Sequence, residues 1–163
     1  MFFFTELKKI QNNFAGKIAI LIDMDGVVAD YRFGEGKNIE NNVPGTYLNK
    51  RPILTTINIL KEVNNAFDFD MYILSSCRHD EQAIEKSKWL EKNMPFIDKK
   101  HQLFVVSNTF EDRKMLKINK IKEIMVTKYD KVIMIDDTHD ILFLAIKELG
   151  DKVIPYHVIT LFD

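Results

Sequence analysis

The sequence predicts an α/β fold: a doubly wound, Rossmann-like parallel sheet of about five strands with helices on both faces. The chain has 163 residues, which suits one domain of ordinary size. From Lys17 onward, short apolar runs alternate with longer segments of helical period, as in β-α-β units. The apolar runs are continuous, as expected for strands that are covered on both faces.

The elements follow in order along the chain. A short helix is predicted within residues 1–16, with Thr5 as its cap and an end near Phe14. Five strands are predicted at Ile18–Ile22, Met71–Leu74, Leu103–Val106, Val132–Ile135 and Val153–Ile154. The helices between them are predicted at Ile53–Asn65, Asp80–Asn93, Arg113–Thr127 and His139–Leu149. Residues 1–163 are therefore predicted to form a single domain.

The segment 27–52 interrupts this alternation. It is rich in glycine, proline and asparagine and has only weak helical periodicity. We predict a loop or minimal cap inserted after the first strand. A connection of this length without regular structure is more often functional than a plain linker.

Composition restricts the partners. Lys and Arg number 23 against 24 Asp and Glu, giving a formal net charge of −1, which argues against a long nucleic acid but allows a local anion. No apolar stretch is long enough for a membrane span. The single cysteine, Cys77, excludes an internal disulfide and suits a reducing compartment. We therefore expect a cytoplasmic protein without a membrane partner.

Carboxylates gather at two predicted strand ends. Asp23 and Asp25 follow the first strand, and Asp136 and Asp137 follow the fourth, with Asp140 nearby. The carboxyl ends of parallel strands open onto one edge of the sheet, where ligands bind. Acids crowded there repel one another unless a cation is present, and oxygen ligands favour Mg²⁺. An EF-hand loop fits poorly, because apolar residues follow the glycine.

Hydroxyl and ammonium groups are predicted at the other strand ends. Ser75 and Ser76 follow the second strand, where hydroxyl and backbone N–H groups can bind phosphate. Beyond the third strand, Lys114 and Lys117 both have isoleucines at the offsets of a helix that packs on the sheet. A strand-end serine is usually a cap and a lysine run is usually solvated, so the order of these groups carries the prediction.

That order resembles the haloacid dehalogenase-like (HAD) phosphatase superfamily, whose four motifs match across Ile18–Asp140. The most specific element is Ile22–Asp30, which reads Ile-Asp-Met-Asp-Gly-Val-Val-Ala-Asp. Within the superfamily, this phrase looks most like the 5'(3')-deoxyribonucleotidases. Lys88-Trp89-Leu90 and Pro95-Phe96-Ile97-Asp98 are similar to that branch too.

The resemblance implies a magnesium-dependent phosphomonoester hydrolase that works through an aspartyl-phosphate. Asp23 is then the nucleophile, and Asp25 is the acid/base that must keep a proton when Asp23 has lost its own. Asp23, Asp136 and the backbone carbonyl of Asp25 are the implied Mg²⁺ ligands, with Asp137 or Asp140 orienting the ligand shell.

The resemblance also implies how phosphate is held. Ser75 matches the hydroxyl motif with Ser76 as its backup, and Lys117 is preferred to Lys114 as the motif lysine. All these roles require the carboxylates of Asp23 and Asp136 to converge around one cation.

The expected substrate is small and phosphorylated, and the resemblance makes it a (deoxy)nucleoside monophosphate. The insertion is shorter than the helical cap of the deoxyribonucleotidases, so a sugar phosphate or a nucleic-acid end remains an alternative. The loop residues that could contact a base or sugar are Tyr31, Arg32, Phe33, Tyr47 and Arg51.

Two other classes share these features. A non-catalytic phosphate-binding module would keep the pocket without turnover, although such a decayed relative is expected to lose Asp23 or Asp25. A response-regulator receiver also surrounds magnesium with acids, a hydroxyl and a lysine, but its phospho-acceptor lies on a middle strand. Arg78 and His79 are candidate phosphate contacts, and the scattered His101, His139 and His157 are assigned no role.

Overall fold

A computed structural model describes residues 2–31 and 44–163 and contains a five-stranded parallel sheet in the order β3-β2-β1-β4-β5. The strands are β1 (Ile18–Ile22), β2 (Asp70–Cys77), β3 (Gln102–Val106), β4 (Lys131–Asp136) and β5 (Val153–His157). From the central β1, the chain adds strands on one side and then returns to add β4 and β5 on the other. The predicted doubly wound α/β fold is confirmed.

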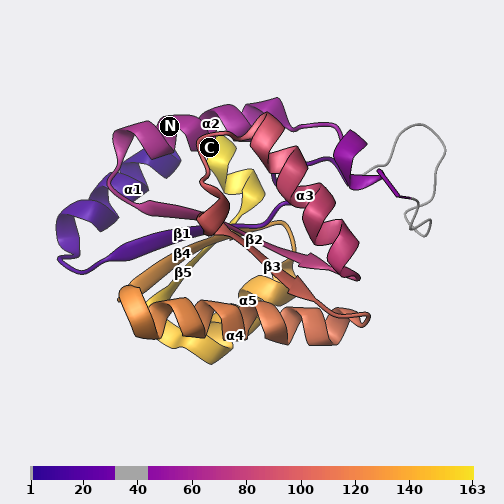
Figure 1. Cartoon of the computed structure of the whole chain (residues 1–163). Helices are drawn as coiled ribbons and strands as arrows, with labels where there is room; N and C mark the ends of the chain where they lie inside the picture. Colours follow the sequence, from indigo (N-terminus) through magenta and orange to yellow (C-terminus); the bar gives the residue numbers. More distant parts are fainter. Residues whose placement is uncertain (1, 32–43) are drawn as a thin grey trace.

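A layer of helices covers each face of the sheet (Figure 1). One layer contains α1 (Phe2–Asn13), α2 (Leu54–Ala66) and α3 (Asp80–Asn93), and the other contains α4 (Phe110–Lys128) and α5 (His139–Leu149). Short 3-10 turns occur at Tyr47–Asn49, Lys99–His101, Gly150–Lys152 and Val158–Phe162. Within the described residues, no helix combines the length and the apolarity needed to cross a membrane.

The sheet is apolar on both sides. Every residue of β1 is buried. Ile20 and Ile22 pack with α1, α2 and α3, while Ala19 and Leu21 pack with α4 and α5. This two-sided burial is the physical reason for the continuous apolar runs in the sequence.

Several element boundaries differ from the prediction; the helix predicted at Arg113–Thr127, for example, is observed at Phe110–Lys128. β2 continues through Ser75 and Ser76 to Cys77, because its ladder with β3 extends beyond the apolar run. Thr5 lies inside α1 and does not cap it. The helix begins earlier because Phe3 and Leu7 are buried in the core and the N–H of Phe2 donates to the carbonyl of Asp163, 2.8 Å away.

The two ends of the predicted insertion meet beside the sheet. The N–H of Asp30 donates to the carbonyl of Arg51 at 2.8 Å, and the N–H of Ile53 donates to the carbonyl of Val28 at 2.8 Å. These bonds bring Lys50 back to the carboxyl edge of β1. Arg32 and Phe33, two of the predicted substrate contacts, lie outside the described residues.

Candidate active site

The chain leaves β1 through a tight turn that fixes the first two carboxylates. The N–H of Asp23 donates to the carbonyl of Ile135 at 2.9 Å, which places Asp23 beside the end of β4. The carbonyl of Met24 then accepts from the N–H of Ala29 at 2.9 Å. Gly26 has a φ of +80° in this turn, and a Cβ there would collide with the carboxylate of Asp137. Glycine is therefore required at this position.

Three carboxylates converge where β1 and β4 end side by side. Asp23, Asp136 and Asp137 each offer an oxygen, and these oxygens all lie within 4.8 Å of one another. Asp136 is fully buried and Asp23 nearly so. An oxygen-only donor set of this kind suits Mg²⁺. Asp140 is exposed in the first turn of α5, outside this group of three.

Lys117 of α4 lies against the same carboxylates. Its Nζ donates to Asp23 Oδ1 at 2.7 Å and to Asp136 Oδ2 at 3.0 Å. Lys114 instead pairs with Glu111 at 2.8 Å. Of the two lysines that the sequence left open, the structure brings Lys117 to the acids, because the face of α4 that carries Lys117 and Ile121 is buried.

Asp25 lies between two lysines that the sequence analysis did not identify. Lys50 binds one carboxylate oxygen and Lys86 binds the other, at 2.5 Å. The fully buried Nζ of Lys86 also donates to the Oγ of Ser75 at 2.9 Å and to the carbonyl of Ser76 at 2.8 Å. One signal was available in the sequence, since Lys86 shares the helical face of Trp89 and Leu90, where an unpaired lysine would be costly.

Burial and neighbouring charges shift the pKa values of Asp23 and Asp25 in opposite directions. Burial acts to raise the pKa of Asp25, but the charges of Lys86 and Lys50 outweigh it and lower the pKa to about 2. Burial raises the pKa of Asp23 to about 7, with Lys117 opposing the shift and Asp136 and Asp25 adding to it. In the metal-free protein this is the reverse of the expectation that Asp25 keeps its proton more firmly than Asp23.

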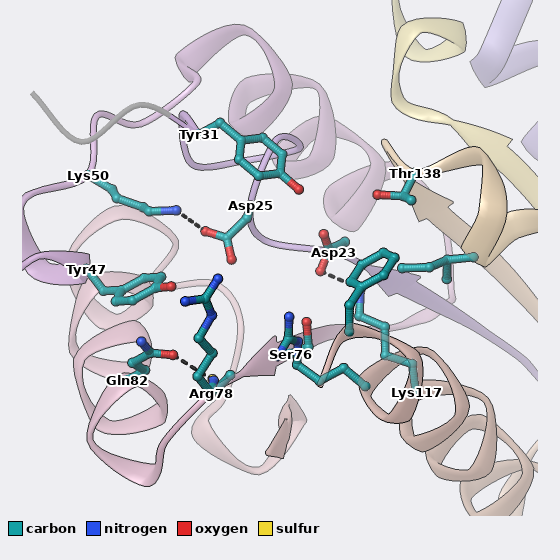
Figure 2. Close-up of a pocket in the computed structure, with 14 residues that line it drawn as sticks. Asp23, Asp25, Tyr31, Tyr47, Lys50, Ser76, Arg78, Gln82, Lys117 and Thr138 are labelled. Carbon is teal, nitrogen blue, oxygen red and sulfur yellow. Dashed lines mark hydrogen bonds and ion pairs between the residues drawn. The ribbon is translucent and has the colours of Figure 1, made fainter. Parts of the chain in front are cut away.

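Two of the acids and two of the lysines, Asp23, Asp25, Lys50 and Lys117, border a hollow of about 150 Å³ at the carboxyl edge of the sheet (Figure 2). Ser76 lines it, whereas the fully buried Ser75 is bonded to Lys86 and is absent from the lining. The strand that places Ser75 toward Lys86 turns Ser76 the other way, because successive side chains alternate across a strand. The full lining comprises Asp23, Asp25, Tyr31, Tyr47, Lys50, Ser76, Cys77, Arg78, Gln82, Phe110, Arg113, Lys117, Thr138 and Ile141.

The remaining predicted contacts separate into two groups. Tyr31, Tyr47 and Arg78 line the hollow, and Arg78 points into it (Figure 2). Arg51 and His79 are exposed and do not appear in the lining. Phe110, Arg113 and Thr138 line the hollow although the sequence analysis assigned them no role. Neither Phe110 nor Thr138 belongs to a pattern that would have identified it.

The histidines lie apart from the carboxylate oxygens of the acid group. The rings of His139 and His157 stack with centroids 4.5 Å apart, and Nε2 of His157 lies 3.0 Å from the carbonyl oxygen of Asp137. His101 packs on Tyr72 at 4.3 Å between ring centroids.

Several solved structures share this fold. No family model and no curated protein matches the chain by sequence. A chain of the Pnkp1/Rnl/Hen1 RNA repair complex has a TM-score of 0.61 at 18% identity, covering 88% of this chain and 43% of that one. The present chain therefore spans less than half of that neighbour.

Two further neighbours are covered over most of their length. The class C acid phosphatase from Bacillus anthracis has a TM-score of 0.63 at 18% identity, covering 98% of this chain and 78% of that one. A haloacid dehalogenase-like hydrolase from Burkholderia xenovorans LB400 has a TM-score of 0.56 at 13% identity, covering 85% and 80%. The chain thus has the fold of HAD-like hydrolases.

Proposed function

We propose that the protein is a magnesium-dependent phosphomonoester hydrolase that works through an aspartyl-phosphate. One observation carries the proposal: the carboxylate oxygens of Asp23, Asp136 and Asp137 lie within 4.8 Å of one another, with the ammonium of Lys117 bound to two of these acids. Asp23 and Lys117 of this group line a hollow that Ser76 lines too. The class C acid phosphatase and the haloacid dehalogenase-like hydrolase that share this fold support the proposal.

The three acids are the proposed metal ligands. Asp23, Asp136 and Asp137 offer hard oxygen donors from two adjacent strands, and the sequence resemblance adds the backbone carbonyl of Asp25. When bound, Mg²⁺ supplies electrostatic stabilisation to the transferring phosphoryl group. Asp140 is not needed in this set.

The proposed reaction has two transfers. A carboxylate oxygen of Asp23 forms a bond to phosphorus as the bond between phosphorus and the alcohol oxygen breaks. The leaving alcohol oxygen takes a proton from Asp25. Asp25 then accepts a proton from water as the water oxygen bonds to phosphorus and the bond to Asp23 breaks, which releases phosphate. Lys117 and Ser76 hold the non-bridging phosphate oxygens, because charge neutralisation and positioning account for most of the catalysis of phosphoryl transfer.

The two lysines on Asp25 have to be reconciled with its role as an acid. They stabilise its anion in the free protein. The dianionic phosphate of a bound substrate acts in the other direction, because a nearby like charge raises the pKa of a carboxyl group. Lys86 is then a positioning residue, which holds Asp25 through one oxygen and the strand through Ser76.

We propose a nucleotide as the substrate and the cytoplasm as the location. The hollow has a volume of about 150 Å³, which admits a phosphoryl group together with neighbouring atoms of a substrate. Tyr31 and Tyr47 line it, and their rings offer stacking surfaces for a base. The free thiol of Cys77 suits a reducing compartment.

Phosphate release from a panel of phosphomonoesters, with Mg²⁺ or with EDTA, tests the proposal. Asp23→Asn removes the attacking oxygen and should lower turnover by at least about 10⁴-fold, with unchanged circular dichroism. Asp140→Asn is the matched control, because it makes the same substitution at an exposed position and should retain activity. Wild-type activity that survives in Asp23→Asn would overturn the nucleophile, and an inactive wild type would favour a phosphate-binding module.

A further inference from the structure

Two arginines line the hollow, and neither has a carboxylate partner among the described residues. Arg78 directly follows β2 and is exposed, and Arg113 lies in the first turns of α4 and is half-buried. Within residues 2–31 and 44–163, no ion pair involves either guanidinium. Arg113 donates from Nη1 to the carbonyl of Ser107 at 2.8 Å, whereas its neighbour Lys114 is neutralised by Glu111 at 2.8 Å.

The two charges lie close enough to affect each other. Burial lowers the pKa of Arg113, and the positive charge of Arg78 lowers it further. Two like charges beside one hollow repel each other unless an anion joins them. Guanidinium groups bind phosphate oxygens through paired, charge-assisted hydrogen bonds, so a phosphate is the anion that fits best.

Arg78 lies on the side from which the alcohol leaves in the proposed reaction. Asp23, Ser76 and Lys117 surround the position proposed for the reacting phosphoryl group, and Asp25 is the group that protonates the alcohol oxygen. Figure 2 shows Arg78 pointing into the hollow toward the side of Asp25 and Tyr47. An anion bound by Arg78 therefore belongs to the alcohol part of the substrate.

An aromatic surface adjoins this position. The ring of Phe110 lines the hollow, is 46% exposed and has the guanidinium carbon of Arg113 at 5.9 Å from its centroid. Tyr47 lines the hollow too. A phosphate next to flat apolar rings matches the chemistry of a nucleotide that carries phosphate at two positions.

We propose that Arg78 and Arg113 bind a second, non-reacting phosphate on the leaving group. This inference rests on the proposed phosphatase function and narrows its substrate to esters that carry two phosphates. The second phosphate comes either from a nucleoside 3',5'-bisphosphate or from the first phosphodiester at the end of a short oligonucleotide. Both present the same anion to the arginines.

Steady-state kinetics on matched substrates test the proposal. The substrates are thymidine 5'-monophosphate, thymidine 3'-monophosphate, thymidine 3',5'-bisphosphate, and thymidine dinucleotides with a terminal 3'- or 5'-phosphate. We expect kcat/KM for at least one two-phosphate substrate to exceed that of its monophosphate by roughly tenfold or more. Arg78→Gln and Arg113→Gln should each reduce this preference, and the double variant should abolish it. Added salt should reduce the preference as well, because it screens the charges.

Lys120→Gln is the matched control, since it removes one positive charge from the same helix at a side chain that pairs with Glu123 and does not line the hollow. It should keep the preference. A bisphosphate that is favoured over the dinucleotides identifies a free second phosphate, and the opposite order identifies a chain end. Equal kcat/KM for the mono- and two-phosphate substrates would overturn the second site.

Binding to Asp23→Asn separates this proposal from the proposed function. Calorimetry on that variant should show tighter binding of the bisphosphate than of the monophosphates, and adding Arg78→Gln should remove the difference. If the binding difference depends on Arg78 but the wild-type protein has no turnover, the second-phosphate site is supported and the phosphatase proposal is overturned. If the wild type turns over but the binding difference is absent, the phosphatase proposal is supported and the second-phosphate site is overturned.

Discussion

The two ends of the turn Asp23–Asp25 lie in opposite electrostatic surroundings. On the Asp23 side, the described residues bring three carboxylates together with one ammonium group, that of Lys117. On the Asp25 side, one carboxylate faces the ammonium groups of Lys50 and Lys86. Asp23 and Asp25 are only two positions apart in the chain. Asp23 nevertheless lies in a region with an excess of negative charge, which we call the acid-rich side, and Asp25 lies in a region with an excess of positive charge, the lysine-rich side.

The contrast shows how one hollow can hold opposite charges. The side with three carboxylates suits the proposed cation, and the side with two lysines, together with Arg78 and Arg113, suits the proposed anion. A metal phosphate ester carries both charges, so it complements both sides at once. Burial raises the pKa of Asp23, and the charges of Asp136 and Asp25 add to this shift, whereas the charges of Lys86 and Lys50 outweigh burial and lower the pKa of Asp25.

The largest effect is expected from a substitution on the acid-rich side. Asp136→Asn removes one of the three proposed ligands and leaves Lys117 with Asp23 alone. We expect phosphatase activity to fall on the order of 10³-fold and the thermal stabilisation by millimolar Mg²⁺ to disappear. Differential scanning fluorimetry with and without Mg²⁺ measures the second effect independently of activity.

Asp140→Asn provides the comparison for Asp136→Asn. Its carboxylate is exposed and lies outside the group of three, so the Mg²⁺-dependent shift should persist. A lost shift in Asp140→Asn, or a retained one in Asp136→Asn, would contradict the proposed ligand set.

The next largest effect is expected from a substitution on the lysine-rich side. Lys86→Met leaves Asp25 buried with one cation fewer and also removes the bond to Ser75. Breaking a buried ion pair in this way should lower the free energy of unfolding by about 3 kcal/mol, measured by urea denaturation. Lys88→Met, at an exposed position on the same helix, should change it little.

The same variant should alter the response to acid. The pKa of Asp25 is lowered in the folded protein, so its contribution to stability is complete above its unfolded value of 3.8 and is lost as the pH falls toward about 2. Without Lys86 the folded pKa rises, and this contribution shrinks. The midpoint of acid unfolding should therefore move to a higher pH in Lys86→Met, followed by circular dichroism, and a midpoint at or below that of the wild type would contradict this account.

The smallest of these effects concerns the turn between the two sides. Gly26→Ala places a Cβ in a left-handed conformation and against the carboxylate of Asp137. We expect a loss of about 2 kcal/mol in the free energy of unfolding, again by urea denaturation. Gly45 has a φ of +86°, and among the described residues no atom beyond its chain neighbours lies within 4 Å of an added Cβ. Gly45→Ala therefore isolates the backbone contribution and should cost less.

The fold and the acids were accessible to sequence reasoning because their signals are local. α3 and α5 have the predicted bounds, and the five predicted strands all lie within observed ones. The acids were found because carboxylates directly after a buried strand must lie at the sheet edge. The first strand pairs with both β2 and β4, which brings Asp23 and Asp136 together.

The lysine-rich side was not accessible in the same way. Lys86 is 61 positions from Asp25 in the chain, and Lys50 returns only because the ends of the insertion are bonded together. The choice between Ser75 and Ser76 also depended on how far β2 extends, which the ladder to β3 decides.

The sequence by itself determined the α/β class, the order of the elements and the strand ends that carry the acids, since these follow from residue periodicity and from chain connectivity. Only the tertiary structure decided which cations face which carboxylate, and therefore the direction in which the pKa of each carboxyl group is shifted. The physical reason is that a charge interaction depends on the distance through space and on the exclusion of water, and neither quantity is encoded in the spacing of residues along one segment.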